Sequence, residues 1–218
     1  VTNTGFVEFL GTSNFAAASS YVNKGTHVQA ASNINMTSGC TITNDTAGTW
    51  LFEGDGDVNW VSGGTPPVIA NKGLVRKTHG AAISVFDGAW TNTGTIEVES
   101  ATFQISSGSM AGAGVIDIDS GAVFNTPGTL TVPTGAILRG GGTVTDPVNN
   151  TGGSIRPGFS PGKLTITGNY NQSATGELRI ELNGLTPETE YDQLFVNGTV
   201  TLASPLNLLS GYGAKVGD

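Results

Sequence analysis

The sequence has little cysteine, little positive charge and no long apolar run. Its single cysteine, Cys40, excludes an intrachain disulfide, so stability has to come from packing. Nine Lys and Arg residues stand against 17 Asp and Glu residues, which gives a formal net charge of -8. Nucleic acids and anionic lipid surfaces require clustered basic residues, so we expect no nucleic-acid partner. No stretch of about 18 apolar residues occurs, so we expect no membrane insertion by this segment.

The sequence is rich in glycine, and its apolar residues alternate with polar ones. Glycine makes up 33 of the 218 residues, about twice the usual ~7%, which is typical of a turn-rich chain. Ile96 and Val98 alternate with Glu97 and Glu99, and the same pattern recurs at 116–119, 164–167 and 177–182. Successive side chains of a strand point to opposite faces, so these segments are predicted as short strands. Only 13–22, with its three alanines, admits a helical turn.

A recurring tripeptide distinguishes between the folds that short strands can build. Asn-x-Gly begins at Asn3, Asn23, Asn71, Asn92 and Asn150. The intervals between these positions are close to one, two, one and three units of about 20 residues, which is the length of one coil of a parallel β-helix. We therefore predict an all-β fold, a right-handed parallel β-helix (β-solenoid) with about 20 residues per coil. An antiparallel β-sandwich is the alternative, because Asn and Gly are common in turns of any kind.

A solenoid gives a physical reason for Asn and Gly to recur at one corner of successive coils. Coils stack at the ~4.8 Å spacing of hydrogen-bonded strands, so an Asn repeated at one corner can bond its side-chain amide to the next coil. We expect the Gly two residues later to adopt the positive φ of a tight corner.

One stretch of the sequence resembles a known family. Residues 153–172, GSIRPGFSPGKLTITGNYNQ, are similar to a "G-x-I-x-PG-x-SPG-x-L-x-I-x-G-x-Y-x-Q" stretch of large bacterial surface and secreted proteins with autotransporter-like, β-helical passenger regions. The resemblance is good over residues 71–208, whereas residues 1–70 share only the general character of these proteins. It implies an extracellular β-helix that serves as a stalk, fibre or adhesive surface. It carries over no catalytic residues, because the matched residues are turn and core residues.

The resemblance and the pattern together lead to one functional hypothesis. We expect residues 1–218 to form a single β-solenoid segment, a fragment of a longer chain that continues beyond 210–218. The expected role is structural or adhesive, not enzymatic, in a secreted or cell-surface bacterial protein. The expected partners are flanking coils of the same protein or other copies of it, with association into fibres, because strand edges at both ends of a solenoid need cover. Surface glycans are the other partner class.

Parallel β-helices also include polysaccharide lyases and hydrolases, so we consider the acidic residues as catalytic groups or calcium ligands. Glu53, Asp55 and Asp57 alternate with glycine as loose calcium loops do, but the bidentate Glu that closes a calcium-binding loop is missing. Asp117 and Asp119 would share one outward face about 6.6 Å apart. No second acidic pair is expected one coil away in a suitable register. A solvated acidic turn and solvated surface acids are therefore the preferred interpretation, with no metal and no catalytic role.

The remaining candidates point away from cofactors. His27 and His79 have no His or Cys at ligand spacing, so zinc is not expected. Cys40 alternates with Ile42 and is predicted to point inward as a small hydrophobe. We predict no catalytic, cofactor-binding or metal-binding residues. The alternative function is a carbohydrate-binding or carbohydrate-active (lyase/hydrolase-type) β-helix, for which sugar rings would stack on Trp50, Trp60 or Trp90 if those side chains pointed outward.

Overall fold

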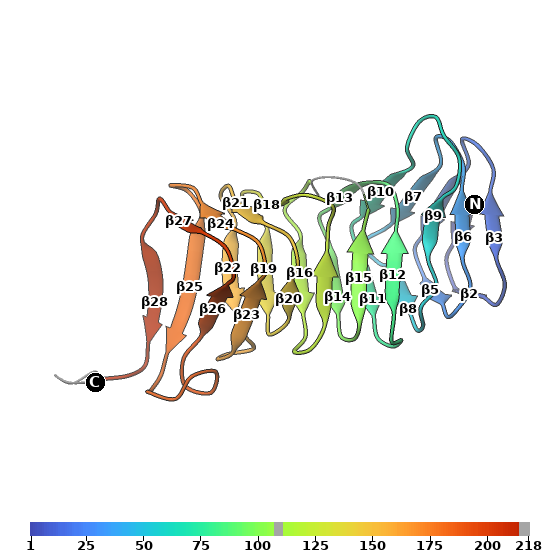
Figure 1. Ribbon diagram of the computed structural model, residues 1–218. Coiled ribbons are helices and arrows are strands. Elements are labelled where there is room, and N and C mark those ends of the chain that lie inside the picture. Colours follow the sequence, from blue (N-terminus) through green and yellow to red (C-terminus); the bar gives the residue numbers. More distant parts are fainter. Residues whose placement is uncertain (107–110, 214–218) are drawn as a thin grey trace.

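The computed structural model describes residues 1–106 and 111–213 and has the form of a parallel β-solenoid (Figure 1). Within these ranges all regular structure is β, in 28 short strands, and no helix long and apolar enough to cross a membrane is found. Every ladder between named strands is parallel, as between β11 (Leu74–Lys77) and β14 (Thr95–Val98). The prediction of a β-solenoid is therefore confirmed, and the antiparallel sandwich is wrong.

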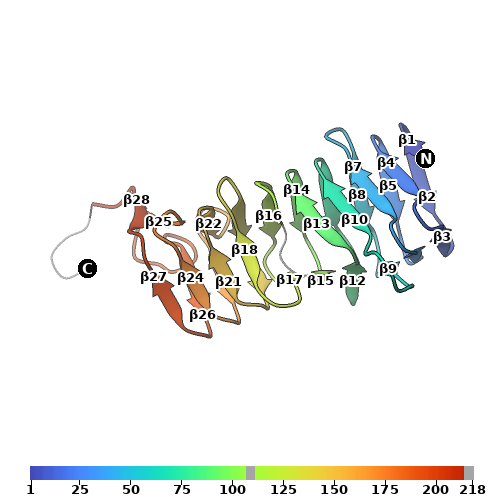
Figure 2. The same cartoon turned by 90° about the horizontal axis from the view of Figure 1, so that it is seen from above.

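The strands form four sheets that run along the rod (Figure 2). Sheet A consists of β1 (Thr2–Asn3), β4 (Ser20–Asn23), β7 (Thr41–Asn44), β10 (Val68–Asn71) and β13 (Ala89–Asn92). Sheet B consists of β2 (Phe6–Phe9), β5 (Thr26–Gln29), β8 (Thr49–Phe52), β11, β14, β16 (Val115–Ile118), β19 (Ile137–Gly140), β22 (Ser154–Pro157), β25 (Glu177–Leu182) and β28 (Leu206–Ser210). Sheet C consists of β3 (Ser13–Phe15), β6 (Ile34–Met36), β9 (Val58–Trp60), β12 (Ile83–Phe86), β15 (Thr102–Ile105), β17 (Val123–Asn125), β20 (Thr143–Val144), β23 (Lys163–Ile166) and β26 (Gln193–Val196). Sheet D consists of β18 (Leu130–Val132), β21 (Val148–Asn150), β24 (Tyr170–Gln172) and β27 (Val200–Leu202).

Each coil adds one strand to each sheet that it crosses, so the first coil is β1, β2 and β3 and the second is β4, β5 and β6. In sheet B the step in sequence between paired residues of neighbouring coils is shortest from Ile137 to Ser154 and longest from Leu178 to Leu206. The strands keep their register while the corners absorb this variation. The amino end and the carboxyl end of the chain lie at opposite ends of the rod (Figure 1).

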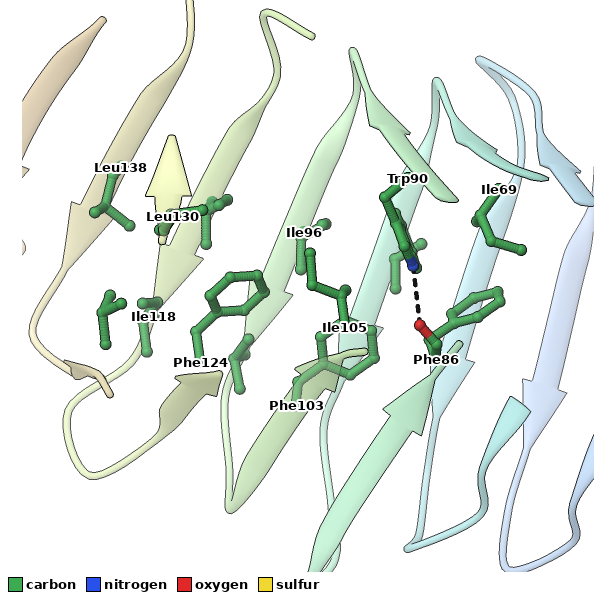
Figure 3. Packing of buried hydrophobic residues seen from close by; sticks show 14 of the residues in the cluster. Ile69, Phe86, Trp90, Ile96, Phe103, Ile105, Ile118, Phe124, Leu130 and Leu138 are labelled. Carbon is green, nitrogen blue, oxygen red and sulfur yellow. Dashed lines mark hydrogen bonds between the residues drawn. The ribbon is translucent and has the colours of Figure 1, made fainter. Parts of the chain in front are cut away.

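The inward side chains of successive coils form one continuous core (Figure 3). The alternation of Ile96 and Val98 with Glu97 and Glu99 appears as a strict change between buried and less buried positions in β14. Aromatic rings of different coils contact one another in this core, as Phe52 and Phe103 do edge to face with ring centroids 5.3 Å apart. Each buried ring or aliphatic side chain contributes about 1.5–3 kcal/mol relative to exposure, so the core stabilises the rod along its whole length.

Two expectations about local structure have different outcomes. The segment 13–22 forms β3 and the beginning of β4, joined by a turn in which Ala18 has a φ of 57°, so the suggested helical turn is wrong. Its alanines lie at a corner between two faces rather than on a buried helical stripe. Residues 214–218, part of the stretch expected to continue into another strand, lie outside the described residues.

A row of buried asparagines connects the first five coils. The Nδ2 groups donate to the Oδ1 atoms of the next coil, from Asn3 to Asn23, Asn23 to Asn44, Asn44 to Asn71 and Asn71 to Asn92, at 2.8–2.9 Å. Each Nδ2 also donates to a backbone carbonyl, as that of Asn71 does to Thr95 at 3.0 Å. These side chains are buried, so their amides depend on one another for hydrogen bonds.

The predicted Asn row is confirmed in part. Asn44 belongs to it although no Asn-x-Gly begins there, because its corner is longer and ends at Gly48. Asn150 does not belong to it. This residue lies on sheet D, where its register partners are Val132 and Gln172, and its Nδ2 donates to the carbonyl oxygen of Glu177 at 3.0 Å.

The reason for the glycine in Asn-x-Gly is a close approach of backbones. A Cβ atom on Gly25, Gly73 or Gly94 would lie 2.0–2.2 Å from a carbonyl oxygen of a glycine one coil earlier. None of the three has a positive φ, and neither has Gly5; only Gly152, with a φ of 150°, does. The predicted positive φ is therefore wrong for four of the five tripeptides, because the stacked glycines provide space rather than a left-handed turn.

We predict that Asn71→Ala lowers the free energy of unfolding by about 2–4 kcal/mol. The substitution leaves the Oδ1 atom of Asn92 and a carbonyl oxygen without their donor in a buried place, and each such group costs about 1–3 kcal/mol. Thermal and urea unfolding followed by circular dichroism measure the change.

Asn35→Ala is the matched control, because Asn35 donates a similar bond to Asn14 of the preceding coil at 3.1 Å on the accessible outer face. We expect it to cost less than about 0.5 kcal/mol. Equal losses for the two variants would contradict the role of burial.

Candidate functional site

The acidic turn at 53–57 surrounds the ammonium group of Lys77. This side chain has no exposed surface, and its Nζ donates to the carbonyl oxygens of Gly54 at 2.9 Å and His79 at 3.0 Å, to Ser84 Oγ at 3.0 Å, and to Asp55 Oδ1 at 3.2 Å. Oxygen atoms arranged around a cation are what a calcium site would provide. Here a side chain of the next coil supplies the positive charge.

The two aspartates of this turn are occupied by backbone amides. Asp55 accepts from the N–H groups of Ala81 and Ala82 at 3.1 Å, and these bonds hold the pKa of its carboxyl below the usual value. Asp57 accepts from Val85 N at 2.8 Å, but burial outweighs that bond and raises the pKa of Asp57. Both carboxylates therefore tie one coil to the next, and the expectation of a merely solvated acidic turn needs this correction.

Lys77 was not among the sequence candidates, although a signal was present. In β11 it alternates with Val75, which places it on the inward face, where its register partners are Phe52 and Val98. A lysine at an inward position requires a buried acceptor. The acidic turn about one coil earlier in the chain was the available partner.

Asp117 belongs to a row of charged residues on the outer face of sheet B, whereas Asp119 follows the end of β16. The row follows the register Arg76, Glu97, Asp117, Arg139 and Arg156 through β11, β14, β16, β19 and β22. We call these residues, together with Arg179 of β25, the charged row. Arg179 follows Leu178, which pairs with Ile155, and so takes the equivalent position in the next coil.

The acids of the charged row are paired with arginine rather than arranged as a calcium or acid pair. Asp117 Oδ2 accepts from Arg139 Nε at 2.7 Å and from Arg139 Nη2 at 2.6 Å. Arg76 Nη2 lies 2.5 Å from Glu97 Oε2, and Arg76 Nε lies 3.2 Å from Glu99 Oε1. Asp117 is buried rather than solvated. The expectation that no second acidic pair lies one coil away in a suitable register is wrong, because Glu97, of the pair Glu97 and Glu99, is the register partner of Asp117.

At the carboxyl end of the charged row three arginines line an open cleft of about 350 Å³. Arg139, Arg156 and Arg179 come from three consecutive coils, and Phe159 and Ser160 of the loop after β22 form one wall. The chain has only four arginines, so three of the four are gathered here. The intervals between them in the sequence are close to the coil length and could have identified the cluster from the sequence.

His27 is a core residue, as the absence of ligand spacing suggested. Its ring lies on that of Trp50 with centroids 3.7 Å apart, and its Nδ1 atom is 3.0 Å from Tyr21 Oη. Burial lowers the pKa of His27 to about 3, so the ring is neutral at neutral pH. His79 lies on the surface with Nδ1 2.9 Å from Thr78 Oγ1.

The other single candidates also lie in the core. Cys40 is buried, as predicted, with its Sγ 3.1 Å from the carbonyl oxygen of Ala16. Trp50 and Trp90 are buried, and Trp90 Nε1 donates to the carbonyl oxygen of Phe86 at 2.9 Å (Figure 3). Trp60 is partly buried. In the part of the chain that the structure describes, no three His, Cys, Asp or Glu side chains are grouped as metal ligands would be.

Comparisons with protein-family models, with curated proteins and with solved structures found no match for this chain.

We predict that calcium leaves the melting temperature of this protein unchanged, because the Lys77 ammonium takes the cation position in the acidic turn. Thermal unfolding is measured with EDTA and with about 5 mM CaCl₂, a concentration above the dissociation constant of even weak calcium sites. Lys77→Met should destabilise the chain by about 2 kcal/mol or more, since Ser84 Oγ, Asp55 Oδ1 and the carbonyl oxygen of His79 all lose a charged donor. A calcium-dependent rise in the melting temperature of the unsubstituted chain would contradict this assignment.

We predict that acid destabilises the fold through His27. Its pKa is about 3 in the folded chain against an ordinary 6.5, so between these values the unfolded state binds the additional proton. Stability is therefore complete above about pH 6.5 and falls toward pH 3, by up to about 1.4 kcal/mol per pH unit. His27→Gln, which keeps an acceptor for Tyr21, should reduce this slope in urea unfolding from pH 7 to pH 4. His79→Gln should not, and parallel curves for His27→Gln and the unsubstituted chain would refute the prediction.

Proposed function

We propose that this solenoid is a structural or adhesive segment of a secreted or cell-surface bacterial protein. The observation that carries the proposal is the contrast between the sides and the ends of the rod. Along the sides, inward apolar residues are covered by the next coil. At the ends of the described residues, strands with apolar core positions have a neighbour on one side only.

The last coil demonstrates this contrast. Leu206 and Leu208 of β28 pair with Leu178 and Ile180 of β25, so they occupy core positions of the rod. Their side chains are nevertheless 44% and 53% exposed. In β27 every residue is exposed as well. Exposed apolar residues and unpaired strand edges together favour addition of another β-layer.

The direction of the strands determines what that layer would be. All coils run parallel and the two ends of the rod differ, so the carboxyl end of one copy can pair with the amino end of the next without a change of direction. Such a head-to-tail contact does not close on itself and gives a filament. In a longer chain, flanking coils would pair with the same end strands and so take the place of a second copy.

The proposal includes no catalytic role, and the tryptophans do not favour a carbohydrate-active one. Sugar stacking on Trp50 or Trp90 would require outward rings, whereas both rings lie inside the coil. Of the acids considered for catalysis or calcium, Asp55, Asp57 and Asp117 accept from backbone amides, Lys77 or arginine. An extracellular location remains part of the proposal and is supported by the resemblance at 153–172 alone.

We predict that the 218-residue chain associates reversibly, with a mean mass that rises with concentration in light scattering and sedimentation. Leu206→Lys combined with Leu208→Lys should shift the population toward monomer, because charges at the end would be buried in the contact. Ile83→Lys is the matched control, since Ile83 is 46% exposed on the side of the rod. A monomer at all concentrations, or equal effects of both variants, would refute end-to-end association.

A further inference from the structure

Two of the three arginines in the cleft at the carboxyl end of the charged row form no ion pair with the part of the chain that the structure describes. Arg139 is paired with Asp117, but among residues 1–106 and 111–213 no carboxylate lies within 4.0 Å of the guanidinium nitrogens of Arg156 or Arg179. Arg156 Nε donates to Ser154 Oγ at 3.0 Å. The guanidinium group of Arg179 donates no hydrogen bond to the described part of the chain, so its five N–H donors are available.

The two acids that line the cleft are occupied elsewhere. Asp192 is buried, and its two oxygens accept from the backbone N–H groups of Gly162 and Glu181, both at 2.9 Å. Glu181 accepts from Ser160 Oγ at 2.6 Å. These bonds fix the loops around the cleft.

Glu177 is a third acid in the neighbourhood of these arginines. Its carboxylate accepts from Ser154 Oγ at 2.6 Å and from Asn207 Nδ2 at 2.5 Å. These two bonds, and to a smaller degree the charges of Arg156 and Arg179, lower the pKa of Glu177. The arginines therefore act on Glu177 only at a distance, and their N–H donors remain for another acceptor.

The stacking of like charges in this row has a cost. Arg139 and Arg156 are direct register partners, and Arg179 takes the next position. Like charges directly opposite one another on a sheet are destabilising. An anion between the guanidinium groups would remove this repulsion and accept paired hydrogen bonds, which arginine donates to carboxylate and sulfate-like groups in a planar fork.

An aromatic ring stands beside these arginines. Phe159 lines the same cleft and is 54% exposed, although a ring of this size usually lies in the core. A flat apolar ring next to anion-binding groups matches a sugar ring that bears an acidic substituent. The cleft is open, and its cationic groups repeat at the ~4.8 Å distance between coils, which suits a chain molecule with repeated anionic groups better than a single ion.

We propose that the Arg139, Arg156, Arg179 and Phe159 cleft is a binding site for an acidic polysaccharide. The carboxylate or sulfate groups would lie on Arg156 and Arg179, and one sugar ring would lie against Phe159. This proposal does not depend on end-to-end association, because the cleft is on the side of the rod and uses none of the terminal strands.

Binding of fluorescent oligosaccharides to the 218-residue chain tests the proposal. The probes are a polygalacturonate oligomer with carboxylates, a heparin oligomer with sulfates, and neutral dextran, each at low and at physiological ionic strength. We expect at least one acidic probe to bind, dextran not to bind, and added salt to weaken binding. Arg156→Gln combined with Arg179→Gln should weaken it by about tenfold or more, because hydrogen bonds to charged groups are lost.

Arg76→Gln is the matched control, because Arg76 lies in the same charged row and is already paired with Glu97. It should leave affinity within about twofold of the unsubstituted chain. Phe159→Ala should weaken acidic probes several-fold without changing their salt dependence. Circular dichroism and the melting temperature establish that each variant is folded.

Four results would overturn the proposal. They are the absence of binding by either acidic probe, an unchanged affinity in the double arginine variant, an equal loss in Arg76→Gln, and competition by inorganic sulfate as effective as that by the oligomers per anionic group. Binding of anionic lipid vesicles without binding of acidic sugars would also replace the polysaccharide with a membrane surface.

Discussion

The whole structure depends on hydrogen bonds between a coil and its successor. A short parallel strand cannot satisfy its own polar groups, so its backbone and inward amides are satisfied only when the next coil repeats the same position. The row from Asn3 to Asn92 applies this rule to side chains, because each amide donates to its counterpart one coil later. The same dependence explains the glycine beside the asparagine, since close stacking of corners leaves no room for a Cβ atom.

This dependence gives the sides and ends of the rod different properties. On the sides all inward groups are covered by neighbouring coils, so outward residues are free to vary, and the charged row places Arg76, Glu97 and Asp117 without regard to the core. At the carboxyl end of the described residues, Leu206 and Leu208 have a neighbouring coil on one side only and are largely exposed. Association along the axis and ligand binding on the sides are therefore physically independent, which allows a rod to have both.

The parts of the fold that follow from repetition were predictable from the sequence. Alternation identified β14, and the spacing of Asn-x-Gly identified the coil and the Asn row, because both depend on local period. Asn44 was missed since its corner is longer. Lys77 and the arginine cluster were missed although the inward position of Lys77 and the coil-length spacing of the arginines were visible in the sequence. The partners of Lys77 and the loop beside the arginines were not predictable in the same way, because they depend on which corner meets a given strand. The positive φ assigned to Gly25, Gly73 and Gly94 was wrong because the space between two corners is not a local property of the chain.

Corners are consequently where this fold acquires features that repetition does not provide. The shortest step in sheet B, from Ile137 to Ser154, is followed by the loop that carries Phe159, and the longest, from Leu178 to Leu206, includes the segment that carries Asp192. Strand register aligns Arg139 and Arg156, whereas the loop after β22, which carries Phe159, and the segment that carries Asp192 line the cleft beside them. The strands alone would present these arginines on a flat face, so the connections between the strands are what turn the row of charges into a concave site.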